Sequence, residues 1–214
     1  MKYKYLFNGK KISTFGYGLY KGEVSKKGDD QLLDSVLYGI KKGINVIDTA
    51  QRYRNGRSEK LIKQILKKYK KRKNLIIVSK AGLIPRYIKE RKILKKLNIR
   101  SSNCLLENDF CIDPIYISWS VDNSLKLMNT EYIDFYLLHN PEISLMMKDG
   151  YRKIIEACKI LELKRKEKKI SNYGISTWNG FRRQNNNKFQ INISNLLDDL
   201  KKEIGEDHGF KCIE

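Results

Sequence analysis

The 214-residue length is typical of one domain, so we expect a single domain over residues 1–214. Hydrophobic residues make up 41% and charged residues 32%, which excludes a disordered chain, and no apolar run suits a membrane helix or a signal peptide. The net charge of +20 suggests nucleic-acid binding, but the densest basic runs, 67–73 and 164–169, fall where we expect helices to end.

No zinc-finger, helix-turn-helix or aromatic–basic pattern accompanies that charge, so we expect no specific nucleic-acid partner. The four cysteines lack the paired spacing of metal ligands, and the chain has only two histidines. We therefore expect free thiols, no bound metal, no membrane partner and a cytoplasmic location. The cysteines are Cys104, Cys111, Cys158 and Cys212.

The first elements are a hairpin, a strand and a helix. Residues 3–7 and 11–14 flank Asn8-Gly9, which predicts two antiparallel strands joined by a two-residue turn. Residues 15–20 indicate a first buried strand. Leucine, valine and isoleucine then recur at helical spacing up to Gly43, which predicts the helix stop.

Five further strands are predicted along the chain, with helices between them. An apolar run begins at Ile44 and ends at Asp48, where a strand is predicted. A helix capped by Ser58 then leads to the next strand. We interpret residues 81–112 as an elaborated loop, and Asp113-Pro114 as the start of another helix. The remaining predicted elements are strands at 75–79, 132–138, 173–176 and 210–213, helices at 151–168 and 193–204, and a loop at 185–187.

Strands that alternate with helices pair in parallel, so the sequence predicts an α/β fold. An open doubly wound sheet and a (β/α) barrel compete. No Gly-x-Gly-x-x-Gly follows the first strand, because the third glycine is misplaced. Four apolar runs end at or just before Asp48, Lys80, His139 and Ser176, and barrels carry their chemistry at these strand ends. We therefore predict the (β/α)8 TIM-barrel type.

Each of these residues alone has an ordinary explanation, such as a helix-capping aspartate, a solvated lysine or a core histidine. Their joint placement at successive strand ends is what favours a site. Tyr53, five residues after Asp48, adds a phenol that can give a proton. Lys80 can support the charge left on that phenol, and Asp48 can hold Lys80 through an ion pair.

Four motifs resemble the aldo-keto reductase family in order and spacing. They are Asp48-Thr-Ala-x-x-Tyr53, Asn55-Gly-x-Ser58-Glu59, Lys80, and Ile133-Asp-x-Tyr-Leu-Leu-His139. Tyr173-Gly-Ile-Ser-Thr-Trp-Asn-Gly180 resembles the strand-five segment of one branch of that family. The resemblance implies a barrel that reduces an aldehyde or ketone with NADPH, or alternatively NADH, and without a metal. A small carbonyl compound or sugar-like molecule is then the expected substrate.

The resemblance also implies roles for single residues. Asp48, Tyr53, Lys80 and His139 are the expected catalytic residues, with Tyr53 as proton donor and a neutral His139 orienting the carbonyl oxygen. Ser176 and Thr177 are expected to bind the cofactor, although Thr177 stands where the family commonly has asparagine. Tyr20 and Asn140 are the expected substrate-binding residues.

The family's barrel has eight strands, and six are recognised before Glu214. We therefore expect an incomplete barrel, with about six of eight β/α units and without strands seven and eight or much of the cofactor site. Residues 15–20 and 210–213 then become open edges that allow self-association.

Three functions remain open from the sequence. The first is an oxidoreductase of this family, the second a non-catalytic barrel that acts as a binding or regulatory subunit, and the third a basic nucleic-acid-associated protein. The intact Asp-Tyr-Lys-His set favours the first over the second, because a scaffold does not need it. The lack of a nucleic-acid-reading motif counts against the third.

Overall fold

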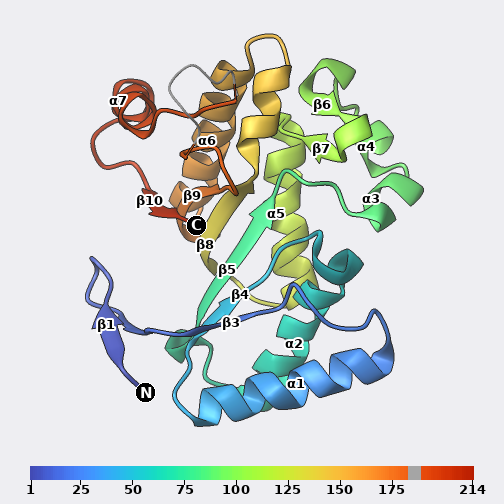
Figure 1. The fold of residues 1–214 in the computed structure, drawn as a ribbon, viewed down its shortest axis with the longest axis vertical. Helices are drawn as coiled ribbons and strands as arrows, with labels where there is room; N and C mark the ends of the chain where they lie inside the picture. The colour runs from blue at the N-terminus through green and yellow to red at the C-terminus, as the bar shows by residue number, and fades with distance from the viewer. Residues whose placement is uncertain (183–188) are drawn as a thin grey trace.

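A six-stranded parallel sheet forms the centre of the computed structural model, which describes residues 1–182 and 189–214 (Figure 1). Its strands are β3 (Gly16–Gly18), β4 (Val46–Asp48), β5 (Ile76–Ala81), β8 (Ile133–His139), β9 (Ile170–Ser176) and β10 (Phe210–Ile213). The order β10-β9-β8-β5-β4-β3 follows the chain without a reversal. A doubly wound sheet reverses its order at a switch point, whereas a barrel does not, so the topology agrees with the barrel type.

Five long helices cover the outer face of this sheet (Figure 1). Each helix contacts the next one along the chain, as in the outer ring of a barrel. The helices are α1 (Lys26–Lys41), α2 (Arg57–Tyr69), α5 (Pro114–Met128), α6 (Gly150–Lys166) and α7 (Ile193–Ile204). No helix in the described ranges is long and apolar enough to cross a membrane. The predicted loop at 185–187 lies outside the described residues.

Side chains alternate between the two faces of each strand, and this alternation divides the core. Outward-facing residues such as Ile47, Ile77 and Tyr136 pack in the main cluster with the helices. Inward-facing Ile76 and Phe135 belong to a smaller cluster that is covered by part of the N-terminal hairpin. Burying one large apolar side chain contributes about 1.5–3 kcal/mol, so the main cluster dominates the stability of the fold.

The sheet is open in the described residues, because β3 and β10 lie at its two edges and do not pair with each other. This agrees with the incomplete barrel that we expect from the sequence. Self-association through these edges stays a prediction.

The N-terminal hairpin pairs β1 (Tyr3–Tyr5) with β2 (Lys11–Ser13), as predicted, but its turn differs. The amide of Leu6 donates to the Lys10 carbonyl at 2.9 Å, and Gly9 donates to the Leu6 carbonyl at 2.9 Å. Three residues therefore form the loop, so the two-residue turn was wrong. Gly9 adopts φ = 77°, which suits the left-handed position that closes a three-residue hairpin loop.

The helix starts gave one confirmed and one wrong prediction. The Asp113 carboxylate caps α5 by accepting a hydrogen bond from the Ile115 amide at 2.8 Å. Ser58, by contrast, lies inside α2, and Gly56 precedes that helix. The Ser58 hydroxyl donates to the Leu19 carbonyl at 2.8 Å, so it ties α2 to the chain after β3 instead of capping the helix.

The segment 81–112 is more structured than the predicted loop. It contains α3 (Arg86–Glu90), α4 (Ile93–Lys96), β6 (Cys104–Leu105) and β7 (Phe110–Cys111). Antiparallel pairing sets Cys104 opposite Cys111, and the two form a disulfide. The prediction that all four thiols are free was therefore wrong. The short hairpin brings together two cysteines with a sequence separation of 7. Cys158 and Cys212 are free.

Short 3-10 turns complete the structure at the strand ends and in the elaborated segment. η1 begins at Tyr53, and η5 begins two residues after His139, with Asn140 between them. The turns are η1 (Tyr53–Gly56), η2 (Arg72–Asn74), η3 (Ser101–Asn103), η4 (Leu106–Asn108) and η5 (Pro141–Met146).

Candidate active site

The C-terminal ends of neighbouring strands bring the predicted polar residues to one side of the sheet. Asp48 ends β4, Lys80 is the penultimate residue of β5, and His139 and Ser176 end β8 and β9. His139 and Ser176 are register partners. Along a strand, every second side chain points to the same face. Asp48, Lys80 and His139 are each separated by an even number of residues from an inward-facing apolar residue of their own strand, and Ser176 is the register partner of His139. All four side chains therefore lie on the inner face.

Lys80 is the centre of this group, and its side chain is 0% exposed. Its ammonium bonds the Asp48 carboxylate, the Thr49 carbonyl at 3.2 Å and the Tyr53 hydroxyl at 3.3 Å. Burial acts to lower the pKa of Lys80, but the surrounding acidic groups outweigh it, and the pKa is raised. Lys80 is therefore charged at neutral pH.

Tyr53 is positioned by the turn that follows β4. The next residue, Arg54, has φ = 48° and a side chain that is 1% exposed. Its guanidinium bonds the Asp29 carboxylate at 2.6 Å and the Glu23 carbonyl, so the turn is anchored to α1 and the segment before it. Burial raises the pKa of Tyr53 although Lys80 opposes it. The phenol therefore keeps its proton at neutral pH.

The other two predicted catalytic groups have opposite shifts. Burial raises the pKa of Asp48 to about 6, against the attraction of Lys80, so its carboxylate is ionised at pH 7. His139 is 6% exposed, and its ring lies edge-on to the Tyr53 ring with 5.8 Å between centroids. Burial, assisted by Lys80, lowers the pKa of His139 to about 3. The imidazole is neutral, as predicted.

Glu214 joins the site, and sequence reasoning missed it. Its carboxylate lies 3.2 Å from the Lys80 ammonium and accepts a hydrogen bond from the Ser176 hydroxyl at 3.2 Å. The signal was present, because Glu214 follows the apolar run of β10 just as Asp48, His139 and Ser176 end theirs. Lys80 thus lies between two carboxylates, those of Asp48 and Glu214.

The predicted binding residues lie around this centre with unequal freedom. Ser176 is 7% exposed and is hydrogen-bonded to Glu214. The Thr177 hydroxyl accepts a bond from the Gly180 amide at 2.9 Å, so it is used in the local turn. Asn140 donates its backbone amide to Ser176, but its side-chain oxygen is buried and has no partner in the described residues. Tyr20 is 55% exposed and packs on Tyr53 with 5.0 Å between ring centroids.

The geometry thus brings Asp48, Tyr53, Lys80 and His139 into one contact network, with Tyr20 at its border. A buried ammonium beside a phenol can stabilise the phenolate that a proton transfer leaves. Among the described residues, no group of three or more His, Cys, Asp and Glu side chains could hold a metal ion. The role of each residue stays a prediction.

Comparison with known proteins gives one family. The model of the Aldo/keto reductase family matches residues 14–194. The chain is 32% identical over 107 residues to the NADH-specific methylglyoxal reductase of Escherichia coli. This aligned segment covers 50% of this chain and 30% of that protein. It is similar in fold to the holo form of aldo-keto reductase AKR11C1 from Bacillus halodurans, with a TM-score of 0.65 and 22% identity, over 100% of this chain and 56% of that one.

A second solved structure, an aldo/keto reductase from Klebsiella pneumoniae in complex with NADP and acetate, matches with a TM-score of 0.56 and 22% identity. That match covers 80% of this chain and 48% of the other. The matched segments also span less than half of each curated relative, between 30% and 45%. The similarity therefore concerns part of a longer type of protein.

Proposed function

Because the chain belongs to the aldo/keto reductase family, we propose that it reduces an aldehyde or a ketone to an alcohol with a reduced nicotinamide dinucleotide. NADPH is the first candidate, since one similar structure is a complex with NADP. NADH is the alternative, since one relative is named as NADH-specific. The substrate is a small carbonyl compound or a sugar-like molecule.

One observation carries this proposal: the buried Lys80 ammonium lies between the Asp48 carboxylate and the Tyr53 hydroxyl. A charge without solvent contact is costly unless it is paired. Breaking such a pair is strongly destabilising, and a scaffold is served equally well by apolar residues there. Retaining it beside a phenol fits proton donation better than it fits a non-catalytic barrel.

The residues at the strand ends fit a nicotinamide. Its carboxamide needs hydrogen-bond partners, and the buried side-chain oxygen of Asn140 is an acceptor without a partner in the described residues. The Glu214 carboxylate, which accepts the hydrogen bond of the Ser176 hydroxyl, offers further acceptor positions at the strand ends. Ser176 would then hold the ring together with Asn140, which we first expected to bind the substrate. Thr177, whose hydroxyl and backbone amide are already hydrogen-bonded to Gly180 and Glu214, would contribute only through its backbone carbonyl.

When bound, the reduced dinucleotide supplies the hydride that adds to the carbonyl carbon. Tyr53 donates its phenolic proton to the carbonyl oxygen, and its raised pKa means that this proton is present at neutral pH. Lys80 supports the negative charge that the phenol then holds, and Asp48 fixes the position of Lys80. Neutral His139 hydrogen-bonds the carbonyl oxygen and orients the substrate.

The test is the oxidation of NADPH and of NADH, followed with a panel of aldehydes, ketones and sugars. We expect turnover with at least one carbonyl and a clear preference between the two cofactors. Loss of turnover in Lys80→Met, together with unchanged binding of the cofactor, would support the proton-transfer role. Binding of neither cofactor would overturn the proposal. The cytoplasmic location stays a prediction, and the Cys104–Cys111 disulfide does not favour it.

A further inference from the structure

Backbone hydrogen bonds to β9 hold Glu214 at the candidate site. The Glu214 amide donates to the Ile175 carbonyl at 2.9 Å, and the Glu214 carbonyl accepts from the Thr177 amide at 2.8 Å. Cys212, two residues earlier, packs with the inward-facing cluster, so the Glu214 side chain also points to the inner face. Its carboxylate therefore reaches the ammonium of Lys80 from the end of β10.

Glu214 acts on Lys80 through its charge. An ammonium has three hydrogens, and the three hydrogen bonds of Lys80 to a carboxylate, a carbonyl and a phenol use them. Oε1 of Glu214 lies 3.2 Å from the same ammonium and accepts its hydrogen bond from the Ser176 hydroxyl, also at 3.2 Å. Glu214 is thus a second counter-ion of Lys80, and Ser176 fixes the position of its carboxylate.

The charged groups around Tyr53 carry an excess of negative charge. Asp48 and Lys80 alone would form a neutral pair, and Glu214 adds a second carboxylate to it. A negative charge close to a phenol disfavours the phenolate. Burial is the largest cause of the raised pKa of Tyr53; Lys80 opposes this shift, and the two carboxylates add to it.

The other titratable groups on the inner face do not change this balance at neutral pH. Burial lowers the pKa of His139 to about 3 and raises that of the Cys212 thiol to about 11, so both are neutral. Tyr20 contacts Tyr53 through its ring. Burial raises the pKa of Asp48 to about 6, so this carboxylate is ionised throughout the basic range. The charge beside Tyr53 is therefore set by two carboxylates and one ammonium.

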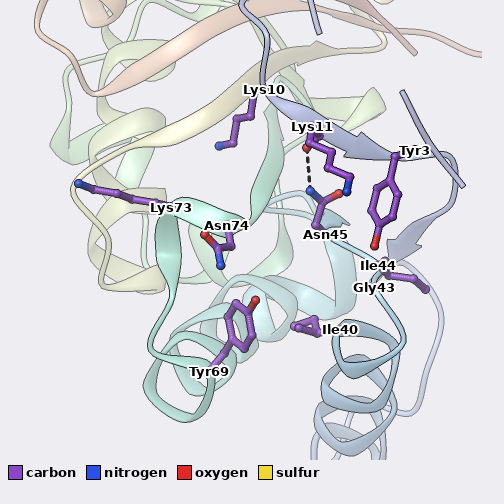
Figure 2. Close-up of a pocket in the computed structure, with 10 residues that line it drawn as sticks. All are labelled: Tyr3, Lys10, Lys11, Ile40, Gly43, Ile44, Asn45, Tyr69, Lys73 and Asn74. Carbon is purple, nitrogen blue, oxygen red and sulfur yellow. Dashed lines mark hydrogen bonds between the residues drawn. The ribbon is translucent and has the colours of Figure 1, made fainter. Parts of the chain in front are cut away.

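Other cations near Tyr53 are paired or remote. The two arginines that flank Tyr53 in the sequence are each paired with an aspartate. Figure 2 shows three lysines around a cavity where β4 and β5 begin, namely Lys10, Lys11 and Lys73. Lys80 follows Ile76, the first residue of β5, by four positions, or roughly 13 Å of strand. That exceeds the screening length of about 8 Å at physiological salt, so these lysines do not balance Glu214.

We propose that Glu214 is a positioning residue of the candidate site, whose carboxylate balances Lys80 and keeps the proton on the Tyr53 phenol. Because of this balance, the phenol remains a proton donor as the pH rises, despite its contact with an ammonium. The consequence for turnover rests on the proposed reductase function, whereas the effect on the ionisation of Tyr53 does not.

Glu214→Gln tests this role, because it removes the charge and keeps an oxygen that can accept from Ser176. The tyrosines are replaced by 3-fluorotyrosine, whose phenol ionises at lower pH, and fluorine NMR follows a pH titration without cofactor or substrate. The signal of Tyr53 is the one that Tyr53→Phe lacks. We expect its midpoint of ionisation to move to lower pH in Glu214→Gln. Glu214→Asp retains the charge and should stay nearer to wild type.

Glu206→Gln is the matched control, because it changes the net charge equally but lies before β10 instead of after it. Its side chain is 80% exposed, so the midpoint of Tyr53 should not move. A shift to lower pH in Glu214→Gln alone supports the proposal. No such shift, or an equal shift in both variants, overturns it. Thermal unfolding of each variant checks that the fold is retained.

The pH profile of carbonyl reduction separates this inference from the proposed function. Turnover should fall as the pH rises through the pKa of Tyr53, and in Glu214→Gln it should fall at lower pH than in wild type. A shifted fluorine midpoint in a protein without turnover would contradict the reductase function and leave the role of Glu214 intact. Turnover with an unshifted midpoint and an unshifted profile would contradict the role of Glu214 alone.

Discussion

The hydroxyl of Tyr53 lies 3.3 Å from the ammonium of Lys80, which has no exposed surface. This contact joins the protonated phenol of Tyr53 to the ammonium of Lys80, whose charge is not screened by solvent. The pKa of Tyr53 is nevertheless raised, because burial disfavours the phenolate more than Lys80 favours it. In the proposed mechanism, Lys80 would therefore stabilise the charge that forms on Tyr53 during proton transfer, without producing a resting phenolate.

Tyr53→Phe removes the proposed proton donor but keeps the ring that packs on Tyr20 and His139. We expect turnover to fall by about 10²–10⁴-fold, the usual contribution of a positioned acid, with cofactor binding almost unchanged. The measurement is carbonyl-dependent oxidation of the reduced cofactor. Tyr38→Phe, an exposed tyrosine on α1, is the matched control and should retain full activity. Substantial activity in Tyr53→Phe would dismiss Tyr53 as the donor.

We expect the buried carboxyl group of Glu59 to make the free energy of unfolding depend on pH. It is fully buried on α2, and burial raises its pKa from 4.5 to about 7, although a hydrogen bond from Ser79 at 2.7 Å opposes the shift. Between these two values the folded state holds a proton that the unfolded state has lost. The stabilisation is therefore complete below pH 4.5 and is lost as pH rises through 7.

Urea unfolding at pH 5 and pH 8 measures this effect. We expect the wild-type protein to lose on the order of 2–3 kcal/mol more than Glu59→Gln between these pH values. Glu90→Gln, at an exposed position of α3, should behave like wild type. The same pH dependence in Glu59→Gln as in wild type would show that another group carries it.

Asp29 supports the turn that carries Tyr53. It pairs with Arg54, whose side chain is almost fully buried, and with Arg57. Asp29→Asn leaves the Arg54 charge without its partner, and breaking a buried pair costs about 3–5 kcal/mol. We expect a lower unfolding free energy and a lower turnover number. Asp30→Asn is the control, because Asp30 is exposed, and it should stay within about 0.5 kcal/mol of wild type.

Because Cys104 and Cys111 form a disulfide, we expect a reductant to lower the stability of the protein. It spans a sequence separation of only 7, for which loop-closure entropy gives a stabilisation of about 2–3 kcal/mol. Asp109 in the same hairpin pairs with Arg52, the residue before Tyr53, at 3.1 Å. Reduction should therefore lower the midpoint of unfolding and also change turnover.

Unfolding with and without dithiothreitol, combined with mass analysis of alkylated thiols, checks that expectation. The double variant Cys104→Ser/Cys111→Ser should have the same midpoint of unfolding as the reduced protein, and dithiothreitol should not change it. Four alkylated cysteines in protein that has never been reduced would contradict the pairing.

The strands and the central site residues could be predicted because both depend on local patterns. Most strands contain short apolar runs, and Asp48, His139 and Ser176 directly end such runs, so parallel pairing alone brings them together. β3 is the exception: its two glycines are exposed and Tyr17 is only partly buried, so the prediction of a buried strand at 15–20 was wrong. Lys80 was placed just after its strand but lies inside it, since β5 continues to Ala81. That shift leaves its face unchanged.

The remaining features depend on tertiary contacts that no local pattern encodes. Ser58 has the residue type of a helix cap, yet its hydroxyl bonds the distant Leu19 carbonyl. The hairpin around Cys104 and Cys111 has strands of two residues each, too short to show alternation. Glu214 became meaningful only when β10 aligned beside β9 and brought its carboxylate to Lys80 and Ser176.

The alternation of side chains along β5 would also make the proposed reductase activity a measure of correct folding. Ser79 contacts Glu59 on the helix side, while Lys80 serves the inner side. Shifting β5 by one residue against its neighbours would exchange these two side chains and bury an ammonium among the helices. A chain folded in that register could remain compact and yet be inert. Specific activity, compared between preparations of equal secondary structure, would then count the correctly aligned molecules.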